Sequence, residues 1–355
     1  MANEEDRMAM YPARAVGTGG TSRGSAEGRL RWGILSTADI AVRKVIPGMR
    51  RSARGEVVAI ASRVAGRADV VARELGIPRA HGTYEALLRD PDVDAVYIPL
   101  PNHLHAEWTI AALRAGKPVL CEKPLALSAS EAQGMVDAAR ETGVPLMEAF
   151  MYRQHPSWVA VRETLATGRI GRVRAVDSWF SYYNDDTGNI RNIAAYGGGA
   201  LYDIGCYTIN LSRMLFAGEP DDVLARVVRD EATGVDVLTS VILAFGDGTA
   251  TFTVSTRVET DQRVHIYGDR GRISIDIPFN IPPDRATRVR VVAGGDPPVA
   301  PGEEILELPA LDPYAAEADA FASAVLDGTP VPVPPEDAVA NLRIIERVFA
   351  AGGGS

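Results

Sequence analysis

The sequence predicts an α/β domain with a doubly wound parallel sheet, followed by an α+β domain with a large, mostly antiparallel open sheet. Three observations lead to this fold class. Between residues 29 and 148, short apolar runs alternate with stretches of helical periodicity. From residue 149 onward, segments of alternating polar and apolar residues follow one another, separated by Gly-Asp turns. The length of 355 residues exceeds what one ordinary core holds and indicates two domains.

The two ends of the chain show neither pattern. Residues 1–28 are rich in glycine and serine and have no apolar periodicity, so we expect a flexible N-terminal arm. This arm has no apolar stretch of the kind that a secretory signal needs. Residues 350–355 are expected to fray. The domains are therefore predicted to span residues 29–148 and 149–355.

Composition argues against two classes of protein. The net charge of -9 argues against a nucleic-acid-binding surface, which needs clustered Lys and Arg. No run of about 18 apolar residues occurs, so we expect no membrane span. The two cysteines, Cys121 and Cys206, each lie in an apolar segment. They indicate reduced, buried thiols in a cytoplasmic protein rather than a disulfide.

Strand and helix alternate throughout the first domain. Right-handed crossovers between parallel strands would place the helices on both faces of the sheet, as in a Rossmann domain. Ligands of such sheets bind where the strands end. The expected strands are residues 29–35, 56–61, 79–81, 95–98, 119–122 and 145–147. The expected helices are residues 65–75, 84–88, 105–115 and 129–142, with one more directly after the turn at residues 36–39.

The turn after the first strand is a candidate phosphate-binding site. A G-x-G-x-x-G fingerprint placed here falls on Ser36, Ala38 and Ala41, so each glycine is replaced by a small residue. Small residues still let the backbone approach a pyrophosphate, and the helix that follows offers its free amides. The residues expected to contact the cofactor in this turn are Ser36, Thr37, Ala38, Asp39 and Ile40.

The end of the second strand favours NADP over NAD. An NAD site usually has Asp or Glu there to bind the ribose hydroxyls. This chain has Ser62 and Arg63, with Arg67 four residues later. A hydroxyl and two guanidinium groups suit a 2′-phosphate. The alternative is that both arginines are merely solvated residues at the start of a helix.

Two more loops follow strand ends. One contains Leu100, Asn102 and His103, and the other contains Glu122 and Lys123 ahead of a proline that rigidifies the turn. We expect these residues to lie against the cofactor. A metal held by His103, His105 and Glu122 is the alternative, and no zinc-type cluster supports it. We therefore predict no metal, and expect His105 to begin a helix.

A glycine turn near the middle of the chain precedes a candidate catalytic helix. Gly197, Gly198 and Gly199 are followed by helical apolar spacing over residues 203–215. If that helix begins near residue 201, Asp203 and Tyr207 share one face. A carboxylate beside a phenol indicates proton transfer. The alternative is an acidic residue favoured by the helix dipole next to a half-buried tyrosine.

The second domain is expected to hold one large sheet. Its open polar face is a plausible subunit interface. The expected strands are residues 173–183, 222–230, 235–245, 249–258, 262–268, 271–277 and 287–292. The expected helices are residues 157–167, 315–326 and 335–349.

These motifs resemble the glucose–fructose oxidoreductase/inositol dehydrogenase (Gfo/Idh/MocA) family. The resemblance covers residues 30–349 and is carried by the motifs Pro101-Asn102-His103, Glu122-Lys123-Pro124, Gly198-Gly199 and Asp203-Ile204-Gly205-Cys206-Tyr207. Residues 32–41 and 278–285 are most similar to NADP-dependent aldose dehydrogenases of the D-xylose type.

The resemblance implies a set of site residues. Lys123, Asp203 and Tyr207 would be catalytic, and many members carry His where this chain has Tyr207. Arg191 would contact the cofactor or the substrate, and Tyr314 is a further cofactor contact. The resemblance also implies a homodimer or homotetramer formed through the C-terminal sheet.

The hypothesis that follows is the oxidation of the anomeric carbon of an aldose to a lactone, with hydride passed to NADP+. Tyr207 would be the general base, with its pKa lowered by Lys123, and Asp203 would orient the sugar. The polar and aromatic loop at residues 182–185, with Tyr183 and Arg191, would recognise sugar hydroxyls. Alternatives are an aldose–aldose oxidoreductase with tightly bound NADP, a keto-sugar or nucleotide-sugar ketoreductase, and a non-catalytic sensor.

Overall fold

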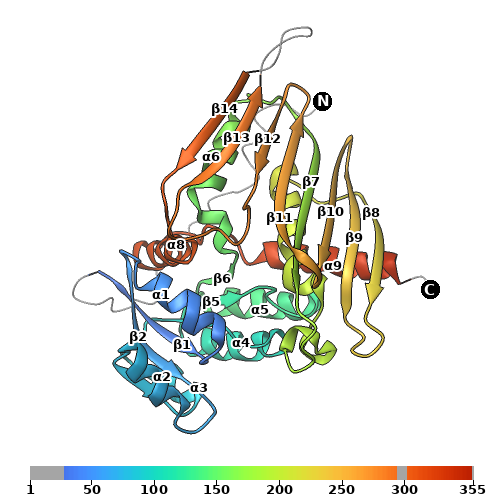
Figure 1. Ribbon diagram of the computed structural model, residues 1–355. Coiled ribbons are helices and arrows are strands. Elements are labelled where there is room, and N and C mark those ends of the chain that lie inside the picture. The colour runs from blue at the N-terminus through green and yellow to red at the C-terminus, as the bar shows by residue number, and fades with distance from the viewer. Residues whose placement is uncertain (1–27, 294–301, 354–355) are drawn as a thin grey trace.

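The computed structural model describes residues 28–293 and 302–353 and contains the two predicted sheets. Figure 1 shows the first sheet with helices around it and the second, larger sheet beside it. The predicted N-terminal arm lies almost wholly outside the described residues. Among the residues described, no helix is both long and apolar enough to cross a bilayer.

The first sheet is parallel throughout, as predicted, with the order β3-β2-β1-β4-β5-β6. The order reverses between β1 and β4, which is where such sheets bind ligands. Its strands are β1 (Leu30–Leu35), β2 (Gly55–Ala61), β3 (Arg79–His81), β4 (Ala95–Ile98), β5 (Val119–Glu122) and β6 (Leu146–Ala149). Its helices are η2 (Ala41–Val45), α1 (Ile46–Met49), α2 (Arg67–Leu75), α3 (Tyr84–Leu88), η3 (Asn102–Leu104), α4 (His105–Arg114) and α5 (Ala129–Thr142).

Helix α8 (Pro313–Asp327) crosses back from the end of the chain onto this first sheet. The buried rings of Trp32 and Phe321 lie 5.4 Å apart between centroids, and Figure 1 shows α8 close to α1. Burying each such ring contributes roughly 1.5–3 kcal/mol. A boundary drawn at residue 148 therefore assigns to the second domain a helix whose apolar side packs against the first.

The second sheet has the order β14-β13-β12-β11-β7-β10-β9-β8. It is antiparallel except for the parallel pair of β7 and β10. Its strands are β7 (Val173–Tyr183), β8 (Asp222–Arg229), β9 (Asp236–Phe245), β10 (Gly248–Ser255), β11 (Arg257–Gly268), β12 (Gly271–Ile275), β13 (Thr287–Ala293) and β14 (Gly302–Leu308). The sequence analysis did not predict β14, whose residues are mostly exposed at the sheet edge.

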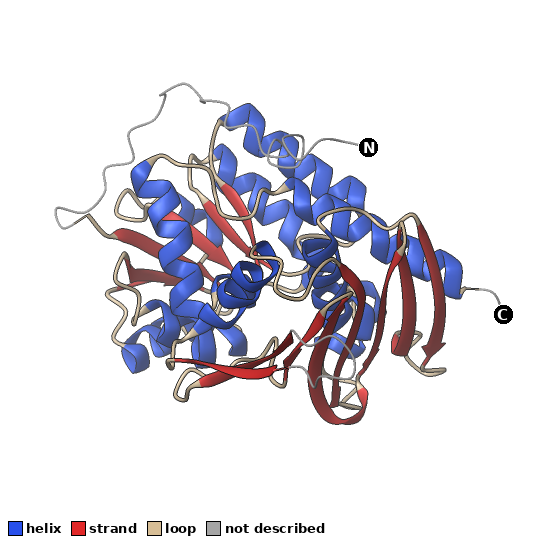
Figure 2. Ribbon diagram, turned by 90° about the horizontal axis from the view of Figure 1, so that it is seen from above, coloured by secondary structure: helices blue, strands red, loops and turns tan. Residues whose placement is uncertain are grey.

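Helices cover only one face of this sheet, as Figure 2 shows. The helices of the second domain are η4 (Met151–Gln154), α6 (Pro156–Ala166), η5 (Ile190–Asn192), η6 (Ala194–Tyr196), η7 (Leu201–Gly205), α7 (Cys206–Phe216) and α9 (Glu336–Gly352). Helix α9 packs against β8, α5 and α7. The expected fraying is wrong for residues 350–352, because α9 continues to Gly352, where a Cβ would lie 2.3 Å from Cγ2 of Val227, while residues 354–355 lie outside the described residues.

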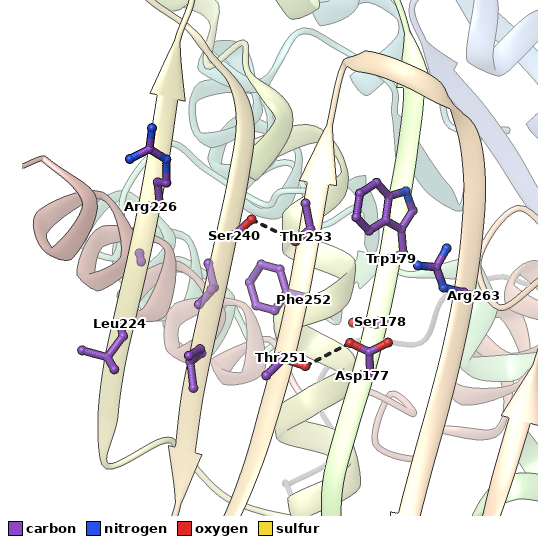
Figure 3. Close-up of a pocket in the computed structure, with 13 residues that line it drawn as sticks. Asp177, Ser178, Trp179, Leu224, Arg226, Ser240, Thr251, Phe252, Thr253 and Arg263 are labelled. Atoms are coloured by element: carbon purple, nitrogen blue, oxygen red, sulfur yellow. Dashed lines mark hydrogen bonds between the residues drawn. The ribbon is translucent and has the colours of Figure 1, made fainter.

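The uncovered face carries apolar side chains in a row across neighbouring strands. Leu224 on β8 is paired in register with Ile242 on β9, and their side chains are 59% and 44% exposed. Both residues line a groove on this face, and Figure 3 shows the hydrogen bonds between Thr251 and Asp177 and between Ser240 and Thr253 among its lining residues. Exposed apolar side chains on a face that no helix covers are typical of an interaction surface.

Candidate active site

A cleft of about 1050 Å³ runs along the carboxyl ends of the first sheet. The strand-end loops of the first domain form one wall. The other wall comes from the second domain, through residues 184–191, the glycine turn and η7. The cleft brings together most of the predicted site residues: Ser36, Thr37, Ala38, Asp39, Ile40, Ser62, Arg63, Arg67, Leu100, Asn102, Glu122, Lys123, Arg191, Asp203, Tyr207 and Tyr314.

The turn after β1 contains no glycine, but its first residue has a backbone conformation that is typical of glycine. Ser36 has φ = +153°, a conformation that L side chains rarely adopt, and its Oγ accepts a hydrogen bond from the Ala38 amide at 3.0 Å. On the other side of the helix, a Cβ on Gly48 would lie 2.6 Å from Cβ of Tyr314. Gly48 therefore lets α8 approach closely enough to place Tyr314 in the cleft.

Basic side chains gather where β1 and β2 end. Arg63 lies over the Tyr84 ring, with its guanidinium carbon 5.5 Å from the ring centroid, and Arg67 begins α2. Arg43 and Lys44, in the first turns after β1, also line this end of the cleft, and the sequence analysis did not select them. They could have been predicted from the sequence, because they form a basic pair shortly after the candidate phosphate-binding turn.

Lys123 and Asp203 meet across the two domains. The Lys123 Nζ donates to the backbone oxygen of Asp203 at 2.6 Å and to Oδ1 at 3.2 Å. Burial alone would raise the pKa of the Asp203 carboxyl, but the charges of Arg191 and Lys123 hold it well below its ordinary range. Burial would lower the pKa of Lys123, and the Asp203 charge outweighs this and raises it. At neutral pH the pair is an ammonium and a carboxylate.

The glycine turn is built so that Asp203 reaches this position. A Cβ on Gly198 would lie 2.6 Å from the Arg191 backbone oxygen, and Gly199 has φ = +116°. The buried carboxylate of Asp236 accepts the Leu201 amide at 2.8 Å and so anchors the start of η7. The predicted helix start near residue 201 is confirmed, but its first turn is a π-turn rather than a regular α-turn.

Tyr207 lies among aromatic rings rather than beside a base. Its side chain is buried, and its hydroxyl donates to Met151 Sδ at 3.4 Å. The Lys123 Nζ lies over the ring face, 4.9 Å from the centroid, and not at the hydroxyl. Burial raises the pKa of Tyr207 well above its ordinary value. The expectation that Lys123 lowers this pKa is therefore wrong for this structure, and the phenol keeps its proton at neutral pH.

Tyr182, and not the predicted Tyr183, reaches the cleft. Tyr182 donates to Asp203 Oδ2 at 2.5 Å, and Arg191 Nε donates to the same oxygen at 3.0 Å. Tyr183 does not line the cleft, is 61% exposed, and donates to Asp185 at 3.2 Å. Neighbouring residues of a strand point to opposite faces, so Tyr182 shares the inward face with Phe180. In the sequence, the signal was that Tyr182 is an even number of residues from the apolar Val176 and Phe180, whereas Tyr183 is not.

His103 also lies outside the cleft lining. Its ring stacks on Tyr196 of the second domain, with centroids 4.2 Å apart, while the neighbouring Asn102 donates to the Gly197 oxygen at 3.0 Å. His105 begins α4, as predicted. Its ring nitrogens lie 2.9 and 2.7 Å from the oxygens of Pro124 and Leu100, which ties two strand-end loops together.

Glu122, which precedes Lys123 in the chain, also lines the cleft. It accepts a hydrogen bond from the buried Tyr97 hydroxyl at 2.5 Å. Burial raises the pKa of the Glu122 carboxyl. Both cysteines, Cys121 and Cys206, are buried and free, as predicted. Within residues 28–293 and 302–353, no cluster of three or more His, Cys, Asp or Glu could hold a metal.

The sequence matches two family models. Residues 30–150 match the oxidoreductase family with an NAD-binding Rossmann fold, and residues 158–274 match the GFO/IDH/MocA C-terminal domain. A D-xylose 1-dehydrogenase (NADP(+)) of Haloferax volcanii is 40% identical over 90% of this chain and 96% of its own length.

Two solved structures are similar over nearly the whole chain. The 3-ketoreductase KijD10 of Actinomadura kijaniata, in complex with NADP and TDP-benzene, is 35% identical with a TM-score of 0.82, covering 91% of this chain and 98% of its own. An aldose–aldose oxidoreductase of Caulobacter crescentus, in complex with glycerol, is 28% identical with a TM-score of 0.82, covering 92% and 98%.

Proposed function

The chain belongs to the GFO/IDH/MocA family of oxidoreductases, and from that premise we propose that it oxidises the anomeric carbon of an aldose, such as D-xylose, with NADP+ as the hydride acceptor. The observation that carries the proposal is the contact of Lys123 with Asp203 across the cleft, with Tyr207 beside it. This places a cation, a carboxylate and a phenol at the end of a dinucleotide-binding sheet.

The residues at the β1 and β2 ends fit NADP. The glycine-like backbone at Ser36 leaves room for a pyrophosphate, and Ser62, Arg63 and Arg67 suit a 2′-phosphate. The two similar proteins named with NADP support the same coenzyme. When bound, the nicotinamide supplies the hydride chemistry, while the protein supplies position and proton transfer.

Lys123 and Tyr207 would act on the sugar oxygen that loses its proton. The Lys123 ammonium stabilises negative charge developing on that oxygen. Tyr207 would take the proton as a phenolate, which its raised pKa makes a minor species at neutral pH. Asp203, already bonded to Lys123, Tyr182 and Arg191, holds these donors in place and orients the ring.

The buried, protonated phenol of Tyr207 favours a second candidate function. A Tyr207 that keeps its proton is ready to donate it to a carbonyl oxygen, so the site suits reduction of a keto sugar in the opposite direction. The 3-ketoreductase similarity supports this alternative, and the aldose–aldose oxidoreductase similarity supports an enzyme that runs in both directions on one bound coenzyme.

A panel of sugars with purified protein separates these functions. We expect NADP+ to be reduced, read as absorbance at 340 nm, when a free aldose is supplied. Absorbance at 340 nm before any coenzyme is added would mark permanently bound NADPH and favour the aldose–aldose enzyme. Oxidation of NADPH by keto sugars, with no reduction of NADP+ by any aldose, would contradict the proposal.

We also propose a cytoplasmic homodimer or homotetramer formed through the uncovered face of the second sheet. The exposed apolar row around Leu224 and Ile242 supports the interface. The free, buried state of Cys121 and Cys206 supports a reducing compartment.

A further inference from the structure

Opposite charges line the two ends of the cleft. The end formed by β1 and β2 is basic. Its one acidic side chain among the described residues is Asp39, whose Oδ2 lies 3.6 Å from Nη2 of Arg43. The cations of this end all come from the first domain: Arg43, Lys44, Arg63 and Arg67. This concentration of positive charge suits the phosphates of a dinucleotide.

The end formed by the second domain has no surplus of positive charge. Among the described residues, the charged side chains that this domain adds to the cleft are Asp186, Arg191 and Asp203. The Asp203 carboxylate balances Arg191 at 3.0 Å while it also holds Lys123 at 3.2 Å. Asp186 accepts the Gly188 amide at 2.9 Å and has no ion-pair partner among the described residues.

Neutral polar groups make up much of the rest of this end. Asn184, Asn189 and Asn280 line it, together with Tyr182. Amides and hydroxyls can donate to and accept from sugar hydroxyls, but they offer no charge to a phosphate. A phosphate dianion that approaches the unbalanced Asp186 carboxylate is repelled, because like charges repel. Asp186 is exposed, so this repulsion weakens as the salt concentration rises.

We propose that this end of the cleft selects an uncharged sugar and rejects sugars that carry a phosphate or a nucleotide diphosphate, with Asp186 as the residue that discriminates. The inference rests on the proposed function, because it concerns the substrate of the same site. It separates unmodified aldoses from aldoses that carry a phosphate away from the anomeric carbon, a distinction that oxidation of the anomeric carbon does not make by itself.

The test compares Asp186→Asn with Asp185→Asn. Both variants remove one negative charge from adjacent positions, but the Asp185 carboxylate contacts Tyr183 outside the cleft. The readout is the ratio of kcat/KM for glucose 6-phosphate to kcat/KM for glucose, each with NADP+. In the unmodified protein we expect this ratio to be far below one. Asp186→Asn should raise it on the order of tenfold at low salt, and less at high salt.

Asp185→Asn should leave the ratio unchanged within about twofold. Equal use of both sugars by the unmodified protein, or equal effects of the two variants, would overturn the inference. If no aldose is oxidised, the proposed function fails by itself. The inference is then judged by calorimetric binding of the same two sugars to the NADP-loaded protein, where tighter binding of glucose 6-phosphate would reject it and tighter binding of glucose would support it.

Discussion

The side chains that we propose as catalytic are held in defined protonation states by their surroundings. The Lys123 ammonium and the Asp203 carboxylate stabilise each other's charge, and both are shielded from solvent. Removing one partner of such a pair leaves an uncompensated charge, at a cost of about 3–5 kcal/mol. Tyr207 is different, because aromatic rings and Met151 surround it and burial raises its pKa.

We expect Tyr207→Phe and Lys123→Met each to reduce aldose oxidation by about a hundredfold or more, as removal of one transition-state donor does elsewhere. NADP+ binding, measured by calorimetry, should change little. Because the raised pKa makes phenolate scarce, kcat/KM for oxidation should rise with pH across the neutral range, and Tyr207→Phe should abolish that rise. Near-normal turnover in either variant would remove that residue from the mechanism.

At the scale of elements, alternation and turn residues were enough to predict the first sheet and most of the second. These local patterns could not predict features that depend on tertiary contacts. Strand β7 was predicted, but the sequence did not show which of its two tyrosines faces the cleft. Tyr182 does, because it lies two residues after Phe180 and so points to the same face of the strand. Strand β14 is mostly exposed and lacks a clear alternating pattern, because it lies at the sheet edge and pairs only with β13.

The sequence predicted most residues of the candidate site, but not how their side chains are arranged. The short motifs led to Lys123, Asp203 and Tyr207, and the structure brings them to one cleft. The π-turn at η7 and the stacking of His103 on Tyr196 depend on packing between domains that no local pattern encodes. The pKa of Tyr207 was mispredicted for the same reason, since burial among rings from distant parts of the sequence raises it.

At the scale of the whole molecule, the two domains are joined at several points around the cleft. Helix α8 packs on the first sheet, and α9 contacts α5. Lys123 and Asn102 of the first domain also bond the second, so the cleft walls are fixed by contacts on more than one side. Among the residues that the structure describes, the opposite face of the second sheet carries none of these contacts, and it is the face that we propose as the subunit interface.

We expect Ile242→Asp to dissociate the oligomer, because it places an unpaired charge in an apolar interface. Val70→Asp is the matched control, since Val70 is 46% exposed on α2, away from the sheet, and Ile242 is 44% exposed. Light scattering would give the mass of each, with circular dichroism to check folding. An unmodified protein that is a monomer, or an Ile242→Asp variant of unchanged mass, would contradict the proposed interface.

The central claim is that hydride leaves the anomeric carbon of an uncharged aldose and reaches NADP+ in this cleft. D-xylose carrying deuterium at C1, incubated with the protein and NADP+, tests it directly. We expect deuterium at C4 of the nicotinamide in the NADPH formed, detected by mass spectrometry and NMR, and slower turnover than for unlabelled xylose. NADPH formed without deuterium, or no NADPH from any labelled aldose, would contradict it.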